Sequence, residues 1–129
     1  MPIHSQVLPR DVHYFDKAAG LALKGELRVR VGCVAAVNNK LICGAFNTYR
    51  NDGRNTEYKN ATHHAEHNCL LMIPERLLDR ATIYIARLNV AGQTVASRPC
   101  NECLKALYWN SIREIVYQDH LSIVKERLD

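Results

Sequence analysis

Two short segments constrain this chain more than any other feature of its sequence. One reads His64-Ala65-Glu66, and the other reads Pro99-Cys100-Asn101-Glu102-Cys103. Together they supply one imidazole, two thiols and a carboxylate, and the imidazole and thiols are donors that Zn²⁺ prefers. Three protein ligands leave one tetrahedral position open, which is typical of catalytic zinc sites and not of structural ones. The pattern therefore predicts a hydrolytic zinc enzyme.

The spacing within each segment predicts how the ligands are presented. Cys100 and Cys103 are three residues apart, so on a helix they share one face and can reach one ion. In the first turn of that helix, the helix dipole favours the thiolate form that binds metal. His64 and Glu66 are two apart and would point nearly opposite ways on a regular helix. We therefore expect a helix that starts almost at His64, and two helix amino termini that converge on the ion.

Two other interpretations of this cluster remain open. A fourth protein ligand would close the site and make it a structural zinc module without chemistry. His63, His67 and Cys69 are the nearby residues that could supply that ligand, or could hold a second metal. A closed site would leave Glu66 without a role.

The two segments together match the pattern H-x-E followed by P-C-x-x-C, and the chain resembles the cytidine and deoxycytidylate deaminase superfamily over about Val29 to Tyr117. The resemblance implies that His64, Cys100 and Cys103 bind zinc and that Glu66 carries protons. It also implies hydrolytic loss of ammonia from C4 of cytosine or C6 of adenine, with water activated by the metal. Similar proteins are oligomers whose neighbouring subunits complete the pocket.

Substrate contacts are expected at four further residues. Asn47 looks like the family's asparagine that contacts the sugar or base, although a turn residue that caps its own loop would look the same. Arg50 and Arg54 lie in the following polar segment, and Arg98 directly precedes the second motif. Arginine binds phosphate through two parallel hydrogen bonds, so these three residues are candidate phosphate ligands, unless they are simply solvated.

The function expected from these features is zinc-dependent deamination of a cytosine-type nucleoside or nucleotide, such as cytidine, deoxycytidine or dCMP. A deaminase of cytosine or adenine in RNA or single-stranded DNA is the first alternative. A catalytically inactive, zinc-containing interaction module is the second. The expected partners are a small nucleoside or nucleotide and further copies of the chain. Nucleic acid is less expected, and no membrane partner is.

Composition agrees with an enzyme of this kind. The 129 residues suffice for one domain, residues 1–129, with 47% hydrophobic and 23% charged residues. A net charge of +4 favours a phosphate-bearing ligand only slightly. Five cysteines, an odd number, argue against a disulfide framework, and Cys33, Cys43 and Cys69 are expected to be small buried hydrophobes. The absence of a long apolar run or a secretory signal predicts a cytoplasmic protein.

The order of apolar and turn-forming segments predicts an α/β sandwich, and the resemblance implies its three-layer α/β/α, cytidine-deaminase-like form. Crossover helices between strands favour right-handed βαβ units. The first helix is expected from Asp11, as its N-cap, to about Lys24, with Val12, Phe15, Ala19, Ala22 and Leu23 on its buried face. A hairpin of two strands, 29–37 and 40–46, should turn at Asn38-Asn39. The remaining predicted segments are a loop over 47–60, a helix from 62 or 63 to 73, a strand over 81–88, a polar connection over 89–98, a helix over 99–110 and a strand over 113–117.

The last stretch, 119–129, has Leu121, Val124 and Leu128 at helical spacing and is expected to form a short helix. Members of the superfamily instead place a fifth strand after the fourth. The sheet is therefore expected to be mixed with four strands, or with five if this stretch is itself the fifth. Tyr108 and Trp109, at the far end of the predicted 99–110 helix, are expected to be core or subunit contacts.

Overall fold

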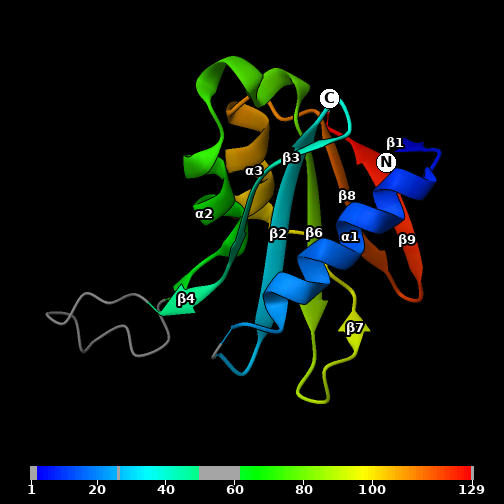
Figure 1. The fold of residues 1–129 in the computed structure, drawn as a ribbon, viewed down its shortest axis with the longest axis vertical. Coiled ribbons are helices and arrows are strands. Elements are labelled where there is room, and N and C mark those ends of the chain that lie inside the picture. The colour runs from blue at the N-terminus through cyan, green and yellow to red at the C-terminus, as the bar shows by residue number, and fades with distance from the viewer. Residues whose placement is uncertain (1–2, 26, 50–61, 129) are drawn as a thin grey trace, which may run out of the picture.

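The computed structural model of the protein describes residues 3–25, 27–49 and 62–128 (Figure 1). Its elements in chain order are β1 (Ile3–Ser5), α1 (Pro9–Ala22), β2 (Arg30–Val37), β3 (Lys40–Phe46), β4 (Thr48–Tyr49), β5 (Thr62–His63), α2 (Ala65–Met72), the 3₁₀ helix η1 (Glu75–Arg80), β6 (Thr82–Leu88), β7 (Thr94–Val95), α3 (Asn101–Trp109), β8 (Glu114–Asp119) and β9 (Ser122–Arg127). None of the helices within these ranges is long and apolar enough to cross a bilayer.

A mixed sheet forms the centre of the fold. Within the described residues it has seven strands, so the predicted count of four or five is wrong, because the short strands β1 and β7 and strand β9 add to it. Its order is β1-β9-β8-β6-β2-β3, and β7 pairs with β6 off this path. The pair β6 and β8 is parallel, whereas the other pairs in the sheet are antiparallel. Helix α3 connects the two parallel strands, as expected for a βαβ crossover.

Helices cover both faces of this sheet, so the predicted three-layer α/β/α architecture is confirmed. Helix α1 packs on one face, while α2 and α3 lie on the other (Figure 1). Side chains alternate between the two layers along each central strand. In β6, for example, Ile83 and Ile85 belong to the core under α2 and α3, whereas Tyr84 and Ala86 belong to the core under α1.

The predicted β2–β3 hairpin is confirmed. The two strands pair antiparallel from Gly32 with Phe46 to Val37 with Lys40. Asn38 and Asn39 both have positive φ, 50° and 59°, which a two-residue hairpin turn of type I′ requires and which asparagine tolerates better than most residues.

The expected helix over 119–129 is wrong, and the alternative strand is correct. Residues Ser122–Arg127 form β9, antiparallel to β8, after a turn in which His120 has φ 54°. Leu121 is 96% exposed in that turn, so its helical spacing from Val124 does not mark a buried face. Strand β9 in turn pairs with β1, which the sequence did not predict. The segment forms a strand because pairing with β8 satisfies its backbone N–H and C=O groups, while its helical pattern offers little apolar surface to bury.

Three predicted connections contain short strands. Thr48–Tyr49 and Thr62–His63 pair with each other as β4 and β5, although the first was expected to be loop and the second to start a helix. Residues Thr94–Val95 add to β6 as β7 within the predicted polar connection. Most of the predicted 47–60 loop lies outside the described residues.

Asp11 is not the N-cap of the first helix, which begins earlier, at Pro9. Its carboxylate instead lies in the first turn and accepts a hydrogen bond from the Leu8 backbone N–H at 2.8 Å. The predicted buried face is also wrong in part, because Val12 and Leu23 are exposed. Tyr14 and Ala18 are buried in their place.

The reason for the burial of Asp11 is a polar network beneath α1. Its carboxylate is 1% exposed, forms a 3.0 Å ion pair with Lys125 and accepts a 2.9 Å hydrogen bond from the Tyr84 hydroxyl. Burial alone would raise the pKa of Asp11, but the hydrogen bonds from Leu8, Lys125 and Tyr84 together lower it below its usual 3.8. The network therefore ties α1 to β6 and β9 through a charged carboxylate.

We expect this network to make stability pH-dependent with a defined sign. Because the pKa of Asp11 is lower in the folded state, its contribution is present above about pH 4 and is lost as the pH falls through the folded value. Asp11→Asn should therefore lower the free energy of unfolding at pH 7 and reduce its fall between pH 7 and pH 3, both measured by urea denaturation. Asp16→Asn changes an exposed carboxylate of the same helix and is the control. An Asp11→Asn variant with the wild-type pH slope would contradict this assignment.

Candidate active site

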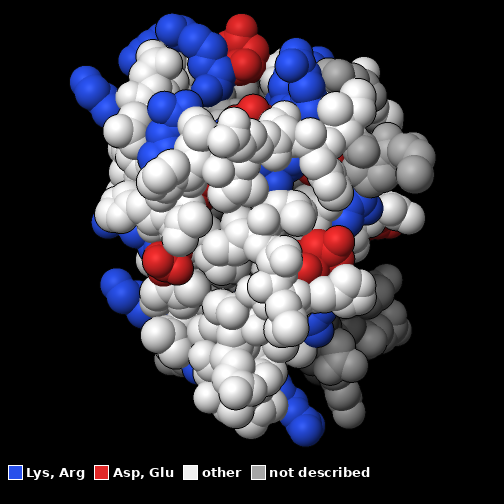
Figure 2. Space-filling model, turned by 90° about the vertical axis from the view of Figure 1, so that its right-hand side faces the viewer, with Lys and Arg blue, Asp and Glu red and all other residues white. Residues whose placement is uncertain are grey.

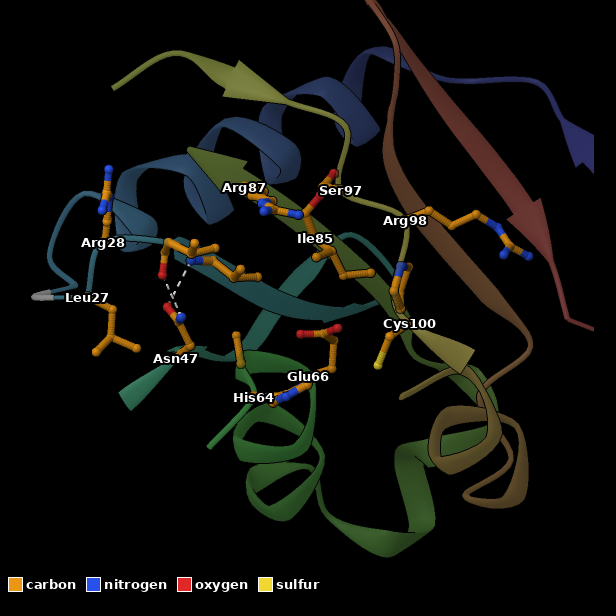
Figure 3. A pocket seen from close by; sticks show the side chains of 14 residues that line it. Leu27, Arg28, Asn47, His64, Glu66, Ile85, Arg87, Ser97, Arg98 and Cys100 are labelled. Carbon is orange, nitrogen blue, oxygen red and sulfur yellow. Dashed lines mark hydrogen bonds between the residues drawn. The ribbon is translucent and has the colours of Figure 1, made fainter. Parts of the chain in front are cut away.

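The two helix amino termini that carry the motifs meet, as predicted. His64 directly precedes α2 in an extended conformation (φ −69°, ψ 142°). Cys100 likewise precedes α3 (φ −65°, ψ 165°), so it lies one residue before the helix and not within its first turn. Since His64 is not helical, Glu66 two residues later can face the same site. Figure 3 shows the Glu66 carboxylate between the His64 and Cys100 side chains.

The donor atoms of the two segments fit a zinc ion. The ligand atoms of His64, Cys100 and Cys103 lie within 4.8 Å of one another, and His64 Nδ1 is 3.1 Å from the Cys103 sulfur. A tetrahedral ion with metal–ligand bonds of about 2.0–2.3 Å separates its ligands by roughly 3.5 Å. One nitrogen and two sulfurs are also the donor types that zinc favours. The three residues therefore fit a zinc ion, and we refer to them as the zinc-binding group.

No fourth ligand joins this group among the described residues, which leaves the position that chemistry needs. Cys69, one of the predicted candidates, is fully buried, and its sulfur lies 3.6 Å from that of Cys43. His67 stacks beside His64 with ring centroids 5.9 Å apart, but it does not belong to the group. The side chain of His63 lies outside the described residues.

The buried Cys103 thiol and Glu66 carboxylate make a bound cation favourable at this site. Burial raises the pKa of the Cys103 thiol far above its usual value, and the nearby Glu66 charge raises it further. This outweighs the lowering expected from the helix dipole. Glu66 itself is only 5% exposed. A divalent cation between these groups would offset the negative charge and stabilise the thiolate.

A cavity of about 490 Å³ opens beside the zinc-binding group. This volume lies in the range of small-molecule sites. Figure 3 shows that its lining comes from the start of β2, from the two motifs and from the end of β6. The lining residues are Leu27, Arg28, Val29, Val31, Asn47, His64, Ala65, Glu66, Ile85, Arg87, Ser97, Arg98, Pro99 and Cys100.

Asn47 lines this cavity, as expected for a residue that meets the substrate. Its amide oxygen accepts a 2.8 Å hydrogen bond from the Val31 N–H, and its amide nitrogen donates at 2.7 Å to the Val29 carbonyl. Asn47 is 8% exposed, and these two hydrogen bonds hold the start of β2 in place. A direct contact with sugar or base stays a prediction.

The predicted phosphate ligands are only partly placed by the structure. Arg98 lines the cavity, but its guanidinium donates two 3.0 Å hydrogen bonds to the buried carboxylate of Glu126. In Figure 3 its side chain runs away from Glu66. Arg50 and Arg54 lie outside the described residues, so their phosphate role stays a prediction.

Two arginines that the sequence analysis did not select also line the cavity, Arg28 and Arg87. The alternation of inward- and outward-facing residues along β6 could have identified Arg87. Arg87 follows Ile83 and Ile85 at every second position of β6, and both isoleucines face the α2–α3 layer. A charged residue on the buried face, just beyond the core, is a common sign of a site.

Tyr108 and Trp109 are exposed, at 42% and 80%, so the core interpretation of these residues is wrong. A contact with another subunit stays a prediction.

Comparisons with known proteins identify the family. The model of the cytidine and deoxycytidylate deaminase zinc-binding region matches residues 9–119. No curated protein sequence matches this chain significantly.

Several solved structures share the fold. The dCMP deaminase of cyanophage S-TIM5, in complex with dCMP and dUMP, superposes with a TM-score of 0.63 at 16% identity, over 85% of this chain and 82% of that one. Cytidine deaminase from Mycobacterium tuberculosis gives 0.55 at 18% identity, over 88% and 86%. RibD from Acinetobacter baumannii, form 1, gives 0.56 at 22% identity, over 82% of this chain but only 27% of that one.

The family match spans most of the chain and includes both motifs. This protein therefore belongs to the cytidine and deoxycytidylate deaminase family of zinc-dependent hydrolases.

Proposed function

We propose that the chain deaminates a cytosine-type nucleoside or nucleotide, that is, cytidine, deoxycytidine or dCMP. One observation carries the proposal: the buried Glu66 carboxylate and a three-ligand zinc group lie together at the wall of a cavity of about 490 Å³. The reaction adds water to C4 of the ring and releases ammonia, so it needs a nucleophile and a proton carrier side by side.

His64, Cys100 and Cys103 would hold a zinc ion, which would supply Lewis acidity and activate a water. The chain's own residues handle the protons. Glu66 takes a proton from the attacking water and gives it to the adjacent ring nitrogen. It then passes the second proton to the amino group as the C4–N bond breaks. The uracil product keeps the water oxygen, and ammonia carries away the amine.

Orientation of the substrate falls to the rest of the cavity. Val31 and Ile85 offer apolar surface beside Glu66, and Pro99 adds to it. Asn47 fixes the β2 edge of the cavity through its two backbone hydrogen bonds. Such a preformed wall favours catalysis because less order has to be created on binding.

The described residues on the β9 side of the molecule form no groove suited to a polymer substrate. Figure 2 shows the face along the β9 side of the molecule, where acidic and basic side chains are scattered among uncharged ones. Binding to RNA or single-stranded DNA usually relies on a continuous basic groove. This face offers none.

The function is tested by ammonia release. Cytidine, deoxycytidine, dCMP, adenosine and short cytosine-containing oligonucleotides are incubated with the zinc-loaded protein. We expect release from at least one of the first three compounds. Release from oligonucleotides alone would replace the proposal with the polymer deaminase, and no release from any compound would favour the inactive module.

Removal of the metal is expected to abolish this activity. Without the cation, the Cys103 thiol keeps its proton because burial raises its pKa, and water is not activated. Dialysis against a strong chelator should lower turnover by at least about 100-fold, and one equivalent of Zn²⁺ should restore it. Full turnover in protein shown to be metal-free would refute zinc dependence.

A further inference from the structure

Arg87 occupies a distinctive position in the sheet. Ile83 and Ile85 precede it on the same face of β6 and are 0% and 1% exposed under α2 and α3. Arg87 is two positions further on, about 6.7 Å along the strand, where that face becomes exposed and lines the cavity. Its side chain thus starts where the buried core ends and the cavity begins.

The backbone of Arg87 is held on both sides. It pairs with Val31 of β2 and with Val95 of β7 in antiparallel register. Val31 itself lines the cavity. Figure 3 shows Arg87 across the cavity from Glu66, with Ile85 between them. The strand therefore fixes the base of this side chain at a defined separation from the reacting end.

The charge of Arg87 is not offset within the described part of the chain. The guanidinium groups of Arg87 and Arg28 have no hydrogen-bond or ion-pair partner there, whereas that of Arg98 is paired with Glu126. The acidic residue among those that line the cavity is Glu66, which lies on the far side. Among the described residues, therefore, two of the arginines that line the cavity have no carboxylate partner.

We propose that the substrate is a nucleoside 5′-monophosphate, and that Arg87 binds its phosphate with Arg28 as a second cation. This inference rests on the proposed deaminase function. The base would lie beside Glu66 and the zinc-binding group, the sugar beside Ile85 and Val31, and the phosphate at the Arg87 end. A guanidinium suits this role because its planar fork donates two hydrogen bonds to a phosphate dianion. Arg98 is assigned no phosphate in this arrangement, since its fork already holds Glu126.

The test compares dCMP with deoxycytidine in the wild type and in Arg87→Ala. We expect the wild type to have a higher kcat/KM for dCMP. Arg87→Ala should lower kcat/KM for dCMP by about 10- to 100-fold, mainly through KM, as expected for loss of a charge-assisted hydrogen-bond pair. The loss for deoxycytidine should be at least tenfold smaller. Arg87→Lys keeps the positive charge but lacks the planar guanidinium. Its kcat/KM for dCMP should therefore lie between those of the wild type and Arg87→Ala.

Two further measurements separate phosphate binding from general effects. Inorganic phosphate should inhibit dCMP turnover competitively, with an inhibition constant that rises in Arg87→Ala. Arg76→Ala removes the same charge from an exposed position on η1, outside the cavity, and should leave both substrates unaffected. Thermal unfolding of each variant verifies that the fold is kept.

The outcomes are distinct. Equal losses for dCMP and deoxycytidine, no loss for dCMP, or a wild type that prefers deoxycytidine would each overturn the phosphate assignment while the deaminase function stands. A wild type that prefers a cytosine-containing oligonucleotide over dCMP would overturn the monophosphate assignment as well. No ammonia from any substrate would refute the deaminase function itself, and the phosphate assignment with it.

Discussion

Glu66→Gln is expected to lower kcat by about 10²- to 10⁴-fold, the usual contribution of a positioned acid–base group. Glutamine has nearly the same shape as glutamate but cannot take a proton from water and return it to the ring. Because Glu66 is 5% exposed, bulk water has little access from which to replace it. The measurement is ammonia release under saturating substrate, with the zinc content of each preparation determined in parallel. The variant should keep its zinc, since the ligand group consists of other residues.

Glu102→Gln is the matched control for this experiment. Glu102 also lies in the first turn of a motif helix, next to Cys103, but it is exposed and does not line the cavity. Its substitution should leave kcat essentially unchanged. A substantial residual rate in zinc-loaded Glu66→Gln would assign the proton transfer to another group.

Gly32→Ala is expected to destabilise the fold more than any other conservative substitution considered for this chain. A Cβ atom at Gly32 would lie 1.9 Å from the Ala18 carbonyl oxygen and 2.7 Å from the Ala22 nitrogen, both in the backbone of α1. Neither atom can move without shifting the helix away from β2. We expect a loss of about 3 kcal/mol or more, at the upper end for overpacking. Urea denaturation, or the absence of folded protein after expression, provides the measurement.

Gly44→Ala provides the comparison on the neighbouring strand. A Cβ atom there would meet the Leu21 side chain at 2.5 Å, and the end of a leucine can rotate away. The expected loss is about 1 kcal/mol. If the two variants were equally stable, α1 would not approach β2 as closely as the structure places it.

The chemistry at the centre of the site was predictable from the sequence because it depends on residue type and short spacing. The donors of His64, Cys100 and Cys103 are set by side-chain identity, and a separation of three residues brings two thiols to one face of a helix turn. The start of α2 next to His64 followed from the same reasoning, since Glu66 could not otherwise reach the site. The β2–β3 hairpin was also local, because Asn38 and Asn39 tolerate the positive φ that its turn needs.

Features that depend on distant partners were missed. Residues 122–127 carry a weak helical pattern, and they form β9 because the open edge of β8 offers hydrogen bonds that no local pattern records. Asp11 resembles an N-cap in sequence, but Lys125 and Tyr84, which are far along the chain, draw it into the interior.

The sequence by itself determined which donor atoms are available to a metal and which carboxylate lies beside them, since these properties belong to residue types at fixed short separations. Only the tertiary structure decided which arginines line the cavity without a carboxylate partner among the described residues. Arg98 stands beside the motif but is neutralised by Glu126, whereas Arg87 stands on strand β6 and lines the cavity. The availability of a charge depends on every group folded around it, and long-range packing alone fixes those groups.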